Sequence, residues 1–147
     1  MPDLVIRNAA VLTMARHIQT DELTTPAVAT DIRIRDRELV ELGKVIPQSG
    51  DIEFDASGLI AVPGFVQGHL HYCQTLFRGL ADDLALIDWL QQRIWPLEAA
   101  HDPDSIRLSA ELSVVELLRG GTTTSQVMES IHHTEVSFSV AHASRMI

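Results

Sequence analysis

The sequence has 147 residues, of which 46% are hydrophobic, so it is long enough and apolar enough to form a packed core. Its formal net charge of −9 and its scattered lysines and arginines argue against a nucleic acid polymer as partner. No apolar run has the length of a membrane span, no signal-peptide pattern is visible, and the single cysteine, Cys73, excludes an intrachain disulfide. We therefore expect a cytoplasmic protein that does not associate with a membrane.

Residues 1–62 have the pattern of short strands joined by polar turns. The predicted strands cover residues 4–7, 10–14, 31–35, 38–42, 52–55 and 59–62, with residues 15–30 as an irregular connection. Asn8-Ala9 is expected to form a turn, and Asp36-Arg37 is expected to close a hairpin. This succession predicts a small β-sandwich domain over residues 1–62.

The pattern changes at Pro63-Gly64, where we place the start of a second domain over residues 63–147. Residues 64–71 predict a buried strand that ends in polar residues. Residues 84–97 predict a helix that Pro96 ends or distorts.

A second helix is expected to begin at Asp102-Pro103 and to end at Gly120-Gly121. It is predicted to bury Leu108, Leu112, Val115 and Leu118. A strand over residues 122–128 and a helix from about residue 134 follow. This order predicts an α/β fold, the start of a TIM-type (β/α)8 barrel after a small β-sandwich. Such a barrel needs about 250 residues, so we expect this one to be truncated after about two βα units.

His69 and His71 are the candidate metal ligands. Residues two apart on a strand point to the same side, so both imidazoles can reach one ion. At the carboxyl end of the first barrel strand they would lie where barrel active sites form. A His-x-His pair taken alone is more typical of two half-buried polar residues at a strand end.

Several further motifs, before and after His69 and His71, favour the metal-binding interpretation of the two histidines. Residues 63–71 (PGFVQGHLH) resemble the entry signature of the amidohydrolase superfamily, with Gln67 where Asn or Asp is commoner. Residues 75–84 (TLFRGLADDL), 88–90 (DWL), 94–98 (IWPLE) and 120–124 (GGTTT) are similar to the branch of adenosine, S-adenosylhomocysteine and methylthioadenosine deaminases. Guanine deaminases and atrazine-type chlorohydrolases share this scaffold.

The resemblance implies roles for three further residues. Glu98 occupies the position of a carboxylate that contacts ribose hydroxyls, and Trp89 a position that lines the substrate pocket. Gln74 lies where guanine deaminases also have glutamine, and its amide could pair with a guanine-like ring edge. The structural alternatives stay open: a solvated Glu98, a Trp89 in the core and a Gln74 that starts a loop.

Other polar or reactive residues are given structural interpretations. Cys73 is expected to be a small apolar filler and Trp95 a core residue. One of His132 and His133 is expected to cap the helix that follows. Glu129, His101 and the pair Asp82-Asp83 carry no catalytic assignment.

The resemblance implies a metal-dependent hydrolase acting on a non-peptide C–N bond. The expected reaction is deamination of an aminated purine or purine nucleoside, a small-molecule heterocycle, by a metal-activated water. The cofactor would be one divalent ion, zinc or alternatively iron. Later strands would supply the remaining His, His and Asp, so we expect no catalytic residue in this stretch, which alone would be inactive. The full-length protein would be a homo-oligomer. The alternatives are a non-catalytic scaffold or assembly subunit and a triazine-type chlorohydrolase.

Overall fold

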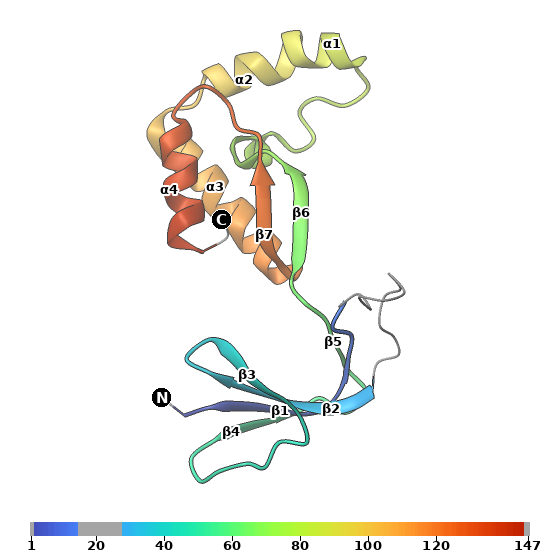
Figure 1. Ribbon diagram of the computed structural model, residues 1–147. Coiled ribbons are helices and arrows are strands. Elements are labelled where there is room, and N and C mark those ends of the chain that lie inside the picture. Colours follow the sequence, from blue (N-terminus) through green and yellow to red (C-terminus); the bar gives the residue numbers. More distant parts are fainter. Residues whose placement is uncertain (1, 15–27, 146–147) are drawn as a thin grey trace, which may run out of the picture. The chain divides into compact units, whose positions relative to one another are not determined.

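The chain divides into two compact units, Met1–Pro63 and Gly64–Ile147 (Figure 1). The computed structural model describes residues 2–14 and 28–145. Most of the predicted connection over residues 15–30 therefore lies outside the described residues. Each unit has its own strands and packing, and only the second contains the candidate site residues.

The first unit is built on one mixed sheet. Its strands are β1 (Leu4–Val11), β2 (Val28–Arg35), β3 (Glu38–Gly43), β4 (Ile52–Asp55) and β5 (Ile60–Ala61). The order is β3-β2-β1-β4, and β5 also pairs with β1. β1 is antiparallel to β2 and parallel to β4 and β5. Among the described residues these strands form a single layer.

Two dipeptides in this sheet were predicted to form turns, and only one of them does. The predicted turn at Asn8-Ala9 is wrong, because β1 runs through it with a bulge. Asn8 has φ of 61°, which asparagine tolerates well, and its N–H donates to Asp31 at 2.9 Å. The predicted hairpin is confirmed: Asp36 and Arg37 both have positive φ, 48° and 73°, as a two-residue turn of this hand requires.

A buried arginine, Arg33, lies at the centre of a network of ion pairs and hydrogen bonds in the first unit. The Arg33 side chain is only 3% exposed and forms ion pairs with Asp3 at 2.9 Å and Asp51 at 2.8 Å. It also donates to the carbonyl oxygen of Ile46 at 2.7 Å. Arg35 donates to the same Asp3 carboxylate. Hydrogen bonds from Arg35 and Arg33 lower the pKa of Asp3 from 3.8 to about 2.

This network predicts an acid-sensitive first unit. Because the pKa of Asp3 is depressed in the folded chain, its contribution to stability is complete above about pH 4 and lost as the pH falls toward 2. We expect Asp3→Asn to lower the urea midpoint at pH 7 and to flatten the loss of stability across that window. Circular dichroism of the full chain in urea at stepped pH measures both effects.

The matched control is Asp36→Asn, at an exposed turn position where asparagine keeps the left-handed conformation. This control should retain the wild-type pH dependence. Identical acid profiles for wild type and Asp3→Asn would show that the Arg33 network contributes nothing to it.

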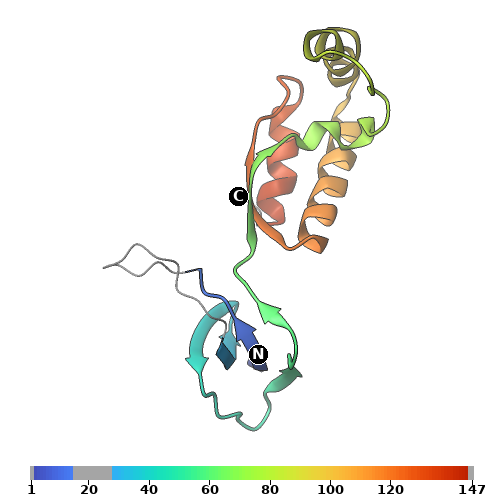
Figure 2. The ribbon, with the colours of Figure 1, turned by 90° about the vertical axis from the view of Figure 1, so that its right-hand side faces the viewer.

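The second unit has the strand–helix order expected for the start of a parallel barrel. Its elements are β6 (Phe65–Leu70), the 3₁₀ helix η1 (Tyr72–Phe77), α1 (Leu86–Trp89), the π-helical segment η2 (Leu90–Ile94), α2 (Trp95–Ala99), α3 (Pro103–Arg119), β7 (Thr122–Val127) and α4 (Thr134–Ala143). β6 and β7 are parallel neighbours. Figure 2 shows α3 and α4 on the same side of the two strands. None of the helices in the described part of the chain is long and apolar enough to cross a membrane.

Local sequence signals explain the helix ends. Pro96 distorts its helix and does not end it: α1, η2 and α2 follow one another without a break, with the π-helical turns just before the proline. Asp102 caps α3 by accepting from the N–H of Ser105 at 2.7 Å. α3 ends as predicted before Gly121, whose φ of 83° favours glycine.

The predicted buried face of α3 is wrong. Its apolar stripe is 40–52% exposed and comprises Leu108, Leu112, Val115 and Leu118. The helix instead buries Ile106, Ser109, Ala110, Ser113 and Val114. This face carries its own apolar stripe, Ile106, Ala110 and Val114, and the two serine hydroxyls beside it bond to the carbonyl oxygen of Tyr72. Tyr72, Ala110, Val114 and Ala141 form the core cluster.

The strand β6 is also less buried than predicted. Phe65 is 57% and Val66 72% exposed, because among the described residues β6 pairs only with β7 and helices cover one face. The Pro-Gly start of the strand has a steric reason. A Cβ on Gly64 would overlap the Thr123 side chain, so only glycine allows β6 to begin this close to β7.

Candidate functional site

The two predicted metal ligands lie together at the carboxyl end of β6. His69 is in the strand, and His71 follows it with an extended backbone (φ −130°, ψ 106°), so the period-two alternation continues through both residues. Their ring centroids are 5.1 Å apart, with planes at 81°. His69 is exposed and His71 half-buried. The pair is therefore open to an ion.

This pair fits part of a metal site. Two imidazoles are suitable zinc ligands, at about 2.0–2.1 Å each, but a catalytic zinc takes three protein ligands. Among residues 2–14 and 28–145, no group of three His, Cys, Asp or Glu side chains could hold a metal ion. The described residues therefore bring together two of the donors that such a site requires, His69 and His71.

The backbone turns sharply directly after His71. The helix η1 starts at Tyr72, and the side chains of Tyr72 and Cys73 are fully buried. The Tyr72 hydroxyl lies 2.6 Å from Ser125 Oγ on β7. The backbone carbonyl oxygen of Tyr72 accepts a hydrogen bond from Ser109 Oγ at 2.7 Å. The turn that follows His69 and His71 is therefore held by hydrogen bonds both to β7 and to α3.

Two residues without a predicted role complete this arrangement. The Glu129 carboxylate, just past the end of β7, accepts from the backbone N–H of Tyr72 at 3.2 Å and of Cys73 at 2.9 Å. His101 is buried, and its Nε2 lies 2.8 Å from the Cys73 carbonyl oxygen. A polar residue directly after a barrel strand was the signal that could have singled out Glu129.

Two of the predicted substrate contacts touch each other. Gln74 Nε2 donates to Glu98 Oε1 at 2.8 Å. The same carboxylate oxygen lies 3.7 Å from the Cys73 sulfur. Burial, with Glu129 beside it, raises the pKa of the Cys73 thiol, which keeps it protonated and fits its interpretation as a filler and not a nucleophile.

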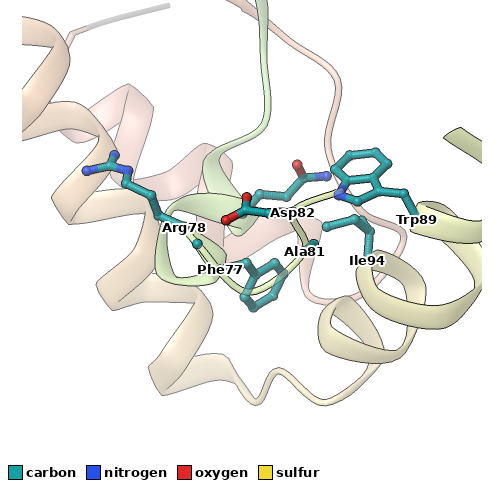
Figure 3. A pocket seen from close by; sticks show the side chains of 8 residues that line it. Phe77, Arg78, Ala81, Asp82, Trp89 and Ile94 are labelled. Atoms are coloured by element: carbon teal, nitrogen blue, oxygen red, sulfur yellow. The ribbon is translucent and has the colours of Figure 1, made fainter. Parts of the chain in front are cut away.

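Two pockets flank the Gln74–Glu98 pair. The first, of about 210 Å³, is shown in Figure 3, and it is lined by Gln74, Phe77, Arg78, Gly79, Ala81, Asp82, Trp89 and Ile94. The second, of about 390 Å³, is lined by Trp95, Glu98, Glu129, Ser130, Ile131 and His132. The structure thus places Trp89 and Gln74 on one pocket and Glu98 on the other.

Two structural interpretations at this site need correction. Trp95 is not a core residue: it is 52% exposed, because it faces the second pocket. His133 occupies the position before α4, with a left-handed backbone, but its side chain makes no capping hydrogen bond. His132 lines the second pocket.

Comparison with known proteins identifies the family. The model of the amidohydrolase family matches residues 60–147, so the chain belongs to that family. It is 38% identical over 124 residues to a 5'-deoxyadenosine deaminase of Methanosarcina mazei, covering 84% of this chain and 27% of the relative. It is 44% identical over 97 residues to a 5-methylthioadenosine/S-adenosylhomocysteine deaminase of Thermococcus onnurineus, covering 66% of this chain and 23% of the relative. The resemblance predicted from the motifs is confirmed, and the chain spans about a quarter of these relatives.

Solved structures confirm the fold. An adenosine deaminase from Xanthomonas campestris with bound zinc matches with a TM-score of 0.70 and 28% identity, covering 97% of this chain and 32% of that chain. The zinc complex of atrazine chlorohydrolase TrzN from Arthrobacter aurescens matches with a TM-score of 0.74 and 23% identity, covering 95% and 33%. The second likeness concerns the fold alone.

The buried His101 contact predicts a stability effect. We expect His101→Ala to lower the free energy of unfolding by about 1–3 kcal/mol, because the buried Cys73 carbonyl loses a partner. Urea denaturation of the full chain measures this change. The matched control is His142→Ala on the exposed side of α4, which should change stability by about 0.5 kcal/mol or less. Equal losses in the two variants would mean that the His101 hydrogen bond has no special weight.

Proposed function

We propose that the full-length protein is a metal-dependent hydrolase that deaminates an adenosine-type nucleoside. In this proposal residues 1–62 belong to the small β domain and residues 63–147 form the first βα units of the barrel. The observation that carries the proposal is the convergence of His69 and His71 at the end of β6, with ring centroids 5.1 Å apart. The deaminase relatives support the choice of reaction.

Each candidate residue has a separate task in this proposal. His69 and His71 bind one divalent ion, zinc in preference to iron. When bound, the ion supplies Lewis acidity, which lowers the pKa of water to about 7. Glu98 accepts hydrogen bonds from the sugar hydroxyls, and Trp89 forms an apolar wall of the pocket beside it. The catalytic proton-transfer groups are expected on later strands of the barrel.

The Gln74–Glu98 hydrogen bond orients the carboxylate that we assign to the sugar. Gln74 Nε2 donates one of its two N–H groups to Glu98 at 2.8 Å, which leaves its second N–H and its carbonyl oxygen available to a ligand. The amide therefore orients the Glu98 carboxylate, and the other carboxylate oxygen, Oε2, is the one that we assign to a sugar hydroxyl.

The first test concerns the metal. We expect about one zinc ion per full-length protein, measured by elemental analysis of material purified without added metal. His69→Ala combined with His71→Ala should abolish the bound metal, because two of its protein ligands are removed. His142→Ala is the control for loss of a histidine as such. Full metal content in the double variant would contradict the assignment.

The second test concerns the substrate. Ammonia release should be fast with 5'-deoxyadenosine, methylthioadenosine or S-adenosylhomocysteine and slow with guanine. We expect Glu98→Gln to lower kcat/KM for the preferred nucleoside by roughly 10–100-fold, because a hydrogen bond to a charged acceptor is lost, with little effect on free adenine. The exposed Glu135→Gln is the control. An equal loss for nucleoside and free base would place Glu98 away from the sugar.

Two wider expectations belong to the same proposal. The protein would act in the cytoplasm on a small-molecule heterocycle, and the full-length form would be a homo-oligomer. Sedimentation of the full-length protein tests the second of these.

A further inference from the structure

The start of η1 has an unusual concentration of side-chain hydrogen bonds. Tyr72 and Cys73 are the first two residues after the metal pair, and all four of their peptide N–H and C=O groups are bound by side chains. Glu129 accepts from both N–H groups. Ser109 and Ser113 donate to the Tyr72 carbonyl, and His101 bonds to that of Cys73.

These partners come from distant parts of the sequence. Glu129 is 57 and 56 residues from the two amides that it binds, and it follows β7, the neighbour of β6. The first N–H groups of a helix have no partner within the helix. At this position the free amides begin one residue after His71. A carboxylate in the loop after the neighbouring strand therefore binds the chain at the point where it leaves His69 and His71.

We propose that Glu129 is a positioning residue, which holds His71 in its metal-binding orientation by clamping the peptide N–H groups of Tyr72 and Cys73. The proposal rests on the metal-binding function proposed above for His69 and His71. Glu129 acts through the backbone: each of its oxygens accepts one N–H, Oε2 from Tyr72 and Oε1 from Cys73. In this proposal both carboxylate oxygens of Glu129 accept backbone hydrogen bonds, and Glu129 is not a further metal ligand.

The chemistry of the clamp requires a carboxylate. Two N–H donors need two acceptor atoms, and hydrogen bonds to an ionised acceptor are roughly twice as strong as neutral ones. A glutamine would offer one acceptor oxygen and turn an NH₂ group toward the second amide. Alanine would leave both amides without their partner. The expected order of function is therefore glutamate, then glutamine, then alanine.

The experiment uses the full-length protein with Co²⁺ as the metal probe. Affinity is measured by titration of the metal-free protein, and the visible absorption of Co²⁺ reports the ligand geometry. We expect Glu129→Ala to weaken Co²⁺ binding by roughly 10–100-fold, as is typical when a group that orients a metal ligand is removed, and Glu129→Gln to be intermediate. Glu135→Ala, on the exposed side of α4, is the matched control and should bind as wild type.

A second measurement separates positioning from direct ligation. Hydrogen–deuterium exchange of the Tyr72 and Cys73 amides is followed in the metal-free protein, where faster exchange in Glu129→Ala than in Glu135→Ala supports the clamp. Weaker Co²⁺ binding with unchanged exchange would make Glu129 a ligand and overturn the proposal. So would Co²⁺ binding within about two-fold of wild type.

The proposed function can fail separately. If wild type binds no Co²⁺, or binds it equally well after loss of both histidines, the assignment of the metal pair is wrong. The exchange measurement then decides the clamp alone: protected amides that lose protection in Glu129→Ala support it, and amides that exchange alike in both proteins refute it.

Discussion

The second unit depends on how the peptide groups between Leu70 and Gln74 find partners. The chain pairs with β7 up to Leu70, is extended at His71 and is helical from Tyr72. At such a transition the ladder partners are lost before helical partners exist, and buried peptide groups without partners are costly. Here side chains supply the partners: His101 from the loop before α3, Ser109 and Ser113 from α3, and Glu129 from the loop after β7. Because His71 lies immediately before this transition, the bonds that stabilise the turn also hold the backbone that directly follows His71.

This requirement explains why the packing of α3 could not be read from hydrophobic periodicity. The spacing of Leu108, Leu112 and Val115 describes an amphipathic helix correctly, and the capping signal at Asp102 places its start to the residue. Periodicity assigns the leucine face to the core because it weighs apolar area alone. The structure buries the other face, on which Ala110 and Val114 pack in the core cluster and Ser109 and Ser113 bond to the Tyr72 carbonyl oxygen. The element was predictable from local sequence, whereas its rotation depends on a partner 37 residues away.

At the candidate site, too, the features set by local sequence were predictable and those set by distant partners were not. The histidine pair was predictable because alternation along a strand is a local rule, and the hairpin at Asp36-Arg37 was predictable for a similar reason. The contact between Gln74 and Glu98 was not, because it joins a 3₁₀ turn to a helix at a sequence separation of 24 residues. Glu129 had a local signal, its place after a barrel strand, but its bonds to the peptide N–H groups of Tyr72 and Cys73 had none. The same holds for the bond of His101 to the Cys73 carbonyl oxygen, because the types of side chain do not encode distant backbone partners. Motif resemblance supplied the family, but long-range polar contacts supply the geometry.

Both units contain networks of polar groups. In the first, Arg33 is enclosed by carboxylates and a carbonyl oxygen; in the second, Glu129 and His101 bond to three backbone groups of Tyr72 and Cys73. Burying charge costs desolvation energy that the attraction between partners only partly offsets, so an apolar replacement of similar size would often be as stable. Apolar packing, however, is tolerant of small shifts, whereas hydrogen bonds fix distance and direction. At the end of β6 these hydrogen bonds therefore fix the direction of the peptide groups that directly follow His71, in addition to stabilising the turn.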